Sequence, residues 1–349
     1  MKKDKLSTWQ VAILLFFPIF SLFQGFGTYS IINMVGINSY LSILLAYFIG
    51  FIILRIFFII FNFNPNMNIF EKNKYLFGKI VGNFINYIII FLIFFMGIFL
   101  LCDVSLFISK YYFDGNSIFL FMIVMGFIII LFVRNGIVTI ARVSVIFFFL
   151  VIILSLIGVI GLIPHIDINN LLPFIDNGFN SIFMGGIYFS FITILPIYLL
   201  LMIKKDNIKP IKDFNRRIIL LYSISFGLIF LIHIFNIMVL GRYLSSLYQY
   251  PSYISLEKVS FFQFIDRIEK VISLRWIFIS VISISLIINS IHEYKINSLY
   301  ILLLMIVISY IISFNIYLYR FMYYIFPICS IILLFIYLII GITIIKRKN

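Results

Sequence analysis

Two hydrophobic stretches of the sequence are interrupted by residues that disturb an α-helix. These residues are Pro18, Gly25 and Gly27 in the first stretch and Gly185, Gly186 and Pro196 in the second. Where a membrane helix unwinds, its backbone N–H and C=O groups lose their partners and need others away from lipid. A small zwitterion provides both kinds of partner, and its carboxylate suits the positive end of a half-helix. The interruptions therefore indicate a non-covalent ligand site, unless the glycines serve only to let helices pack closely.

Hydroxyl and amide side chains near these interruptions extend the candidate site. Such groups donate and accept hydrogen bonds without carrying charge, so they suit a binding site inside a membrane. With the glycines they form the predicted ligand-binding set: Gln24, Gly25, Gly27, Thr28, Gly185, Gly186, Ser190, Thr193, Ser280 and Ser283.

Ionisable side chains within the hydrophobic stretches are few, and each has an ordinary explanation. Asp103 lies about four residues, or about 6 Å, from the outer end of its predicted helix, so we expect it to reach the interface. Arg55 and Arg142 lie near helix ends, from which long side chains reach water. His233 lies deeper and is expected to make a hydrogen bond between helices rather than to relay protons. Since no acidic or basic residue is predicted at the midplane, a proton pump driven by a carboxylate is disfavoured.

The same residues argue against an enzyme. No pair of carboxylates and no activated nucleophile is placed for acid–base or covalent chemistry. The two cysteines, Cys102 and Cys329, lie in separate hydrophobic stretches, and no C-x-x-C or similar metal-ligand spacing occurs. We therefore expect no catalytic residue, no metal and no cofactor. The net charge of +14 does not indicate nucleic acid, because the basic residues lie in short loops between hydrophobic runs.

Composition shows which elements must hold these residues. Of the 349 residues, 64% are hydrophobic and only 11% are charged, and the mean hydropathy is +1.20. A soluble protein of this length would carry about a quarter charged residues. Lipid must therefore replace water around most of the surface. The sequence predicts an all-α integral membrane protein in which residues 1–349 form a single transmembrane domain.

The hydrophobic runs predict about ten transmembrane helices, since about 20 apolar residues are needed to cross a bilayer. They are Gln10–Met34, Asn38–Phe61, Ile80–Phe107, Ser117–Val133, Val138–Ile163, Ser181–Ile203, Arg217–Leu240, Lys270–Ser290, Asn297–Asn315 and Phe321–Ile345. The interrupted runs are the first and the sixth, so the interruptions occupy corresponding places in two halves of five helices. This pattern predicts two inverted five-helix repeats, about 10–163 and about 181–345, with broken first and sixth helices.

Basic residues predict the orientation of the chain. With the N-terminus inside, nineteen of the 26 lysines and arginines fall on the cytoplasmic side and seven fall outside. The seven outer residues are Lys110, Arg242, Lys258, Arg267, Lys270, Arg275 and Arg320. The imbalance predicts cytoplasmic N- and C-termini and an even number of helices.

The predicted outer segment Leu244–Arg275 contains an amphipathic pattern after Pro251. Its apolar positions at helical spacing are Phe261, Phe264, Ile265, Ile268 and Ile272, and its charged positions are Asp266, Arg267, Glu269 and Lys270. This pattern predicts a helix that lies on the outer membrane surface or is tucked into the mouth of the helix bundle.

Several short motifs resemble the permease-like B subunits of spore germinant receptors. They are the opening Lys5-Leu-Ser-Thr-Trp-Gln10, then Arg134-Asn-Gly-Ile137 with Ala141-Arg142-Val143, then Asn170-Leu-Leu-Pro173 ahead of Asn177-Gly178, and Ile265-Asp-Arg-Ile-Glu269 followed by Trp276. Each motif is short, but their order and spacing run together from the N-terminus to the eighth predicted helix.

The resemblance implies membership of the amino acid–polyamine–organocation transporters, with a core of ten helices in two inverted repeats. It also implies a multi-pass protein of the spore inner membrane that senses a germinant, usually an amino acid or a nucleoside, beside an A-type receptor subunit and a C-type lipoprotein. The sequence departs from the family pattern at Val145 and Ile187, where that pattern often has glutamates. These departures leave the type of ligand and any coupling to cations open.

The function expected on this basis is that of the permease-like subunit of a germinant receptor. Such a subunit binds a small nutrient at the bilayer midplane to trigger germination, in contact with membrane lipid and the two partner subunits. Two alternatives stay open. One is an amino-acid transporter that works alone, and the other is a structural subunit that assembles the receptor without binding a ligand.

Overall fold

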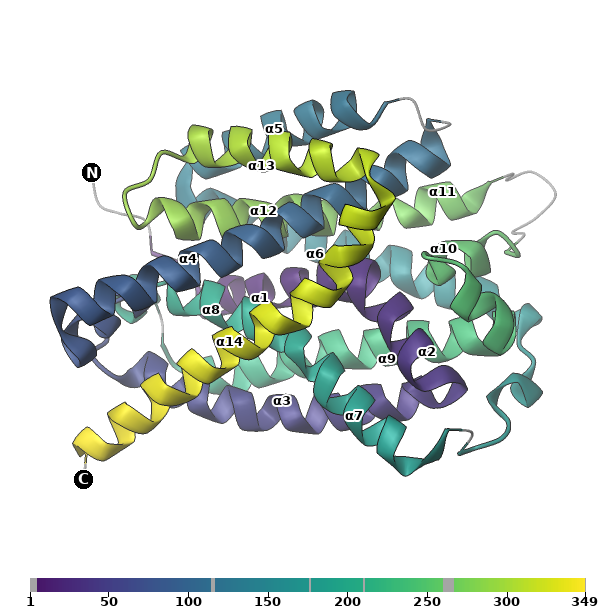
Figure 1. The fold of residues 1–349 in the computed structure, drawn as a ribbon, viewed down its shortest axis with the longest axis horizontal. Helices are drawn as coiled ribbons and strands as arrows, with labels where there is room; N and C mark the ends of the chain where they lie inside the picture. Colours follow the sequence, from purple (N-terminus) through teal and green to yellow (C-terminus); the bar gives the residue numbers. More distant parts are fainter. Residues whose placement is uncertain (1–4, 114–116, 176, 210, 260–266, 349) are drawn as a thin grey trace.

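The computed structural model describes residues 5–113, 117–175, 177–209, 211–259 and 267–348. These residues form helices joined by short loops, and no β-strand occurs among them apart from a single bridge between Leu6 and Ile208. The α-helices are α1 (Thr8–Leu22), α2 (Thr28–Val35), α3 (Ser39–Asn62), α4 (Ile69–Tyr112), α5 (Ile118–Arg134), α6 (Gly136–Leu162), α7 (Gly178–Ser190), α8 (Ile194–Leu201), α9 (Phe214–Leu247), α10 (Pro251–Leu256), α11 (Ile268–Ser273), α12 (Arg275–His292), α13 (Ser298–Phe314) and α14 (Ile316–Lys348), as Figure 1 shows.

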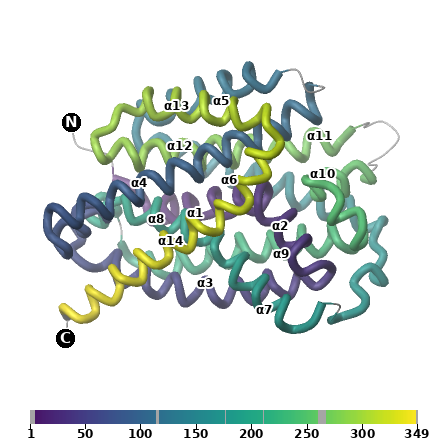
Figure 2. Tube along the Cα trace, in the orientation of Figure 1, coloured from purple at the N-terminus to yellow at the C-terminus, as the bar shows by residue number. Residues whose placement is uncertain are grey.

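The helices confirm the predicted all-α membrane protein. Seven helical stretches are long and apolar enough to cross a membrane. The first of them, Thr8–Asn62, reverses its direction at Gly36, where φ is +79°, so it crosses twice (Figure 2). Two shorter apolar helices, α5 and α13, have 17 residues each. Counted in this way, the described part of the chain contains ten crossing elements.

The first and sixth crossing elements are both broken, as the glycines and prolines predicted. In the first, a π-helical turn at Phe23–Gly27 joins α1 to α2, and α2 turns away from the axis of α1 (Figure 2). In the sixth, a 3-10 turn at Phe191–Thr193 joins α7 to α8. Neither break is an extended stretch of unwound chain. Both change the winding of the helix locally, which rotates the side chains that follow the break.

The two broken elements lie in the interior of the bundle. Nearly every residue of α1 and α8 is buried, whereas α5, α13 and α14 expose large apolar side chains along one face. In a membrane those exposed faces contact lipid, and their exposure carries no penalty. The interior position of the broken elements allows any ligand held there to be shielded from lipid. The division into two repeats stays a prediction.

The helix ends near both termini form one end of the bundle, here called the basic end (Figure 1). It contains residues 204–209 and 211–217, the connection between α3 and α4, and the last turns of α14. The backbone N–H of Leu6 donates to Asn207 at 2.9 Å, and the N–H of Lys209 donates to Leu6 at 2.8 Å. Lys204 forms an ion pair with Glu71 at 2.7 Å. These contacts tie the start of α1 and the start of α4 to the loop after α8.

We expect the basic end to face the cytoplasm. Cysteine at Asn207 should then react with a membrane-impermeant thiol reagent only after the membrane is permeabilised. Cysteine at Glu257, which is exposed at the opposite end, should react in intact cells. Cys102 and Cys329 are buried and give a low background, so the unsubstituted chain is the control. Labelling of Asn207→Cys in intact cells would show that the basic end faces outward and that the predicted orientation is wrong.

Candidate functional site

Gly25, in the π-helical turn of the first crossing element, contacts the carboxyl group of Asp103 on α4. A Cβ atom added at Gly25 would overlap Oδ2 of Asp103 and would lie 3.6 Å from Cζ2 of Trp276 on α12. Glycine is therefore required at this position because a carboxylate occupies the space of a side chain. The contact connects α1, α4 and α12 at one point.

Asp103 is 1% exposed, so the expectation that it reaches the interface is wrong. Its helix continues to Tyr112 rather than ending near Phe107, so it lies about 13 Å from the helix end. The hydroxyl groups of Tyr250 and Tyr319 donate hydrogen bonds to Oδ1, the former at 3.1 Å. Oδ2 has no hydrogen-bond partner among the described residues. A buried carboxylate supported at only one oxygen is an unusual and costly arrangement.

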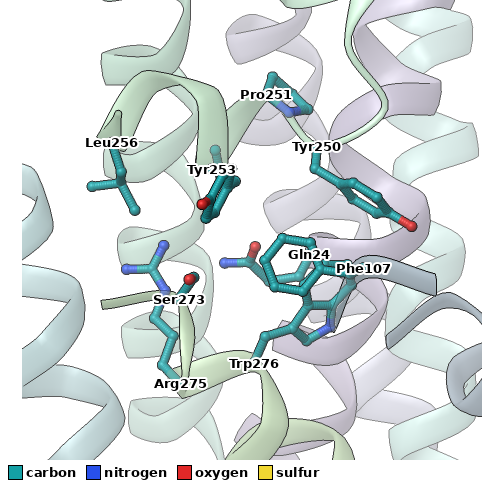
Figure 3. A pocket seen from close by; sticks show the side chains of 10 residues that line it. Gln24, Phe107, Tyr250, Pro251, Tyr253, Leu256, Ser273, Arg275 and Trp276 are labelled. Carbon is teal, nitrogen blue, oxygen red and sulfur yellow. The ribbon is translucent and has the colours of Figure 1, made fainter. Parts of the chain in front are cut away.

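A pocket lies next to this contact, at the end of the bundle opposite the basic end. Its lining residues are Gln24, Phe107, Tyr250, Pro251, Ser252, Tyr253, Leu256, Ser273, Arg275 and Trp276. Figure 3 shows the Gln24 amide pointing into the pocket, with Arg275 on one side and the rings of Trp276 and Phe107 on the other. The pocket is mostly apolar with a few polar groups, which is typical of small-molecule sites. Its interior has room for about one water molecule, so a nutrient could enter only if lining side chains or helices moved.

Two polar groups in the pocket lack partners. Arg275 is 3% exposed, and its guanidinium makes no hydrogen bond or ion pair with any part of the chain that the structure describes. Nε2 of Gln24 is also buried without an acceptor. Both groups are hydrogen-bond donors, and one is positively charged. The pocket therefore has the chemistry to hold an anionic group such as a carboxylate.

The predicted site residues of the first crossing element fall in two places. Gln24 lines the pocket, and Gly25 lies beside it against Asp103. Gly27 faces Phe189, whose Cε2 would be 2.9 Å from an added Cβ. The hydroxyl of Thr28 donates to the carbonyl of Phe23 at 2.9 Å and so stabilises the π-helical turn. Gly27 and Thr28 thus shape the break without reaching the pocket.

The predicted site residues of the sixth element lie outside the pocket. Gly185 and Gly186 are within the regular helix α7 and pack against α3, where an added Cβ at Gly186 would lie 2.5 Å from Leu45. Ser190 donates to the Ile187 carbonyl at 2.6 Å, and Thr193 donates to the Ser190 carbonyl at 2.7 Å. The glycines therefore give close helix packing, and the hydroxyl groups are bonded within their own helix.

Ser280 and Ser283 on α12 also lie outside the pocket. The Ser280 hydroxyl is 3.5 Å from that of Ser21, which links α12 to α1, and Ser283 donates to the Ile279 carbonyl at 2.8 Å. His233 is buried, and its Nε2 lies 2.8 Å from the hydroxyl of Ser39 on α3. The prediction of a hydrogen bond between helices is confirmed for this histidine.

The predicted amphipathic helix is described only in its last part, α11, where Ile272 is buried and Ile268 is half-buried. Glu269, predicted on the charged face, is buried as well, so the predicted division into an apolar and a charged face is wrong at this residue. The short helix α10, which begins at Pro251 and lies above the pocket, contains none of the predicted amphipathic positions. Phe261, Phe264, Ile265 and Asp266 lie outside the described residues.

Comparison with known protein families matches residues 5–295 to the family described as spore germination protein. The chain belongs to the spore germination protein family. Since the match covers most of the chain and includes the first eight crossing elements, it supports a permease-like role in spore germination. No curated protein matches the chain.

The geometry adds residues to the site of this spore germination protein that the sequence did not identify. They are Asp103, Gln249, Tyr250, Arg275, Trp276, Tyr319 and Tyr323, which are brought together from α4, the α9–α10 connection, α12 and α14. Two of them carried a sequence signal: Asp103 is an acidic residue within a hydrophobic run, and Trp276 follows one of the motifs that resemble the family. The tyrosines do not differ in sequence from the many others in the chain.

Proposed function

We propose that this chain is the nutrient-binding, permease-like subunit of a spore germinant receptor, and that its nutrient binds in the pocket beside the π-helical turn of the first crossing element. The observation that carries the proposal is a pair of buried donors, Gln24 Nε2 and the Arg275 guanidinium, which have no partner among the described residues and lie in a mostly apolar pocket. An unpaired buried charge is costly, and a bound anionic group would remove that cost.

The position of the pocket also supports a sensing role. The pocket lies at the end of the bundle opposite the basic end. We infer that the pocket end faces outward, because the basic end is expected to face the cytoplasm. A ligand that enters it must move part of the lining and contact Gln24 at the break between α1 and α2, so binding would be coupled to a rearrangement of the central helix. The proposed assembly includes an A-type receptor subunit and a C-type lipoprotein in the spore inner membrane, with both termini of this chain in the cytoplasm.

The two tryptophans of the chain allow a direct binding test, because Trp276 lines the pocket and Trp9 lies near the basic end. In a Trp9→Phe variant, Trp276 is the single tryptophan. Titrating the purified variant with a panel of amino acids and nucleosides should give a saturable change in tryptophan fluorescence for at least one compound. The Trp276→Phe variant, which keeps Trp9, is the control and should not respond to the same compound.

Spores lacking this chain should also lose germination in response to the compound that binds. If spores lose a response although no compound of the panel binds, the chain is a structural receptor subunit and the proposal is wrong. If a compound binds but germination is unchanged, the chain is an amino-acid transporter that works alone. Both outcomes overturn the proposal in different ways.

A further inference from the structure

Asp103 and four polar neighbours form a hydrogen-bonded cluster beside the ligand pocket, of which only Tyr250 lines the pocket itself. The Tyr319 hydroxyl contacts Oδ1 of Asp103, the Tyr323 hydroxyl at 2.9 Å and the side-chain amide of Gln249. Tyr250 donates to the same oxygen of Asp103, and the Tyr323 hydroxyl lies 3.4 Å from the Gly25 carbonyl. The cluster therefore links a buried carboxyl group to the backbone of the broken helix.

The cluster borders a second cavity on its outer side. This cavity is lined by Leu106, Lys110, Gln249, Tyr250, Ser313, Phe314, Ile316 and Tyr319. Its lining comes from the last turns of α4 and α13, the first turn of α14 and the α9–α10 connection, which all lie opposite the basic end. Tyr250 and Tyr319 both line the cavity and both donate to Oδ1 of Asp103, so one layer of tyrosine side chains separates the carboxyl group from the cavity. Of the two, Tyr319 also contacts the hydroxyl of Tyr323, which leads to the Gly25 carbonyl.

We propose that Asp103 is a proton-binding site that exchanges protons with the outer cavity through Tyr319. Oδ2 is in contact with Gly25 and has no access to solvent, so an ammonium group or a metal ion has no space beside it. A proton needs no such space. Its uptake would remove the charge of a carboxylate that has no cationic partner among the described residues.

The transfer balances within the cluster. The Tyr319 hydroxyl gives its proton to Oδ1 of Asp103 and receives one proton from solvent in the outer cavity, so the net change is one proton moved from solvent to the carboxylate. Protonated Oδ1 then donates to the Tyr319 oxygen, and the hydroxyl of Tyr319 is free to donate to Tyr323. Tyr323 in turn can donate to the Gly25 carbonyl. Protonation therefore reverses the hydrogen bond between Asp103 and Tyr319 and sets the direction of the bond between Tyr319 and Tyr323, while Tyr323 remains the donor to the broken helix.

The other groups around Asp103 do not supply a counter-charge. The titratable neighbours are Tyr250 before α10, Tyr319 and Tyr323 on α14, and Cys102 on its own helix. The turn of the first element contributes Gly25 and Gln24, which do not titrate. Lys110 lines the outer cavity and Arg275 lines the ligand pocket, and neither forms an ion pair with Asp103.

Infrared difference spectroscopy of the purified protein, recorded as a function of pH without any ligand, tests this site. The C=O stretch of a protonated, buried carboxyl group should appear as the pH falls, and it should be absent from Asp103→Asn. The Asp206→Asn variant is the matched control, because Asp206 is exposed at the basic end, and it should keep the band. Tyr319→Phe removes one donor to the carboxylate, so the band should persist to higher pH in that variant.

An unchanged band in Asp103→Asn, or no band at any pH at which the protein stays folded, would overturn the proposal. If Asp103→Asn does not accumulate, Tyr319→Phe keeps the test decisive, since an unshifted band in that variant has the same meaning. The measurement uses no nutrient, so its outcome is independent of whether the pocket binds one.

Discussion

Replacing Gly25 with alanine should reduce the germination response per molecule by about fivefold to 150-fold. The added Cβ overlaps Oδ2 of Asp103 and approaches Trp276, so the carboxyl group or the π-helical turn must move. Overpacking of this kind costs about 1–3 kcal/mol, which corresponds to that range of equilibrium constants. The response is measured as germination of spores whose amount of the variant is determined by quantitative immunoblot.

Gly227→Ala is the matched control for this substitution. Gly227 lies in the helix α9, and a Cβ there would meet no atom within 4 Å, so alanine should leave both abundance and response unchanged. The double variant Gly25→Ala, Asp103→Ala removes the atom that the new methyl group overlaps. This double variant should accumulate as well as the unsubstituted chain, but its germination response per molecule should stay low. A normal response per molecule in Gly25→Ala would exclude the contact between Gly25 and Asp103 from the signalling mechanism.

The fold could be predicted because its main determinant is local in sequence. The length and spacing of the hydrophobic runs set the number of crossing elements, and helix-disturbing residues marked the two that break. The kind of break was not predictable. A π-helical turn at Phe23–Gly27 and a 3-10 turn at Phe191–Thr193 depend on how neighbouring helices pack, which glycine and proline positions alone do not specify.

The candidate site was predicted only in part, because most of its residues are distant in sequence. Asp103 is bonded to Tyr250 and Tyr319, which lie 147 and 216 positions away. Depth along a single helix indicated that Asp103 could reach the interface, but α14 and the α9–α10 connection cover it. Arg275 was placed in an outer loop by its position before a hydrophobic run, whereas it is the first residue of α12 and lines the pocket.

Replacing Arg275 with methionine should separate ligand binding from protein stability. The guanidinium is buried without a partner among the described residues, so its removal should leave the thermal stability of the ligand-free protein unchanged or raised. A ligand that uses this charge should lose about 2–5 kcal/mol of binding free energy, which is about thirtyfold to several thousandfold in Kd. Fluorescence titration in the Trp9→Phe background measures the Kd, and thermal unfolding of the same sample measures stability.

Two further variants make the result specific to Arg275. Arg134→Met, at an exposed position at the end of α5, removes one arginine elsewhere and should change neither quantity. Arg275→Lys keeps the charge but not the planar pair of donors, so its Kd should lie between those of the unsubstituted chain and Arg275→Met. If Arg275→Met binds the nutrient normally, the pocket does not hold an anionic group. If Arg275→Met instead loses both ligand binding and thermal stability, Arg275 has a structural role. A charge without a partner should destabilise the ligand-free protein, so a loss of stability on its removal contradicts the proposed role in binding.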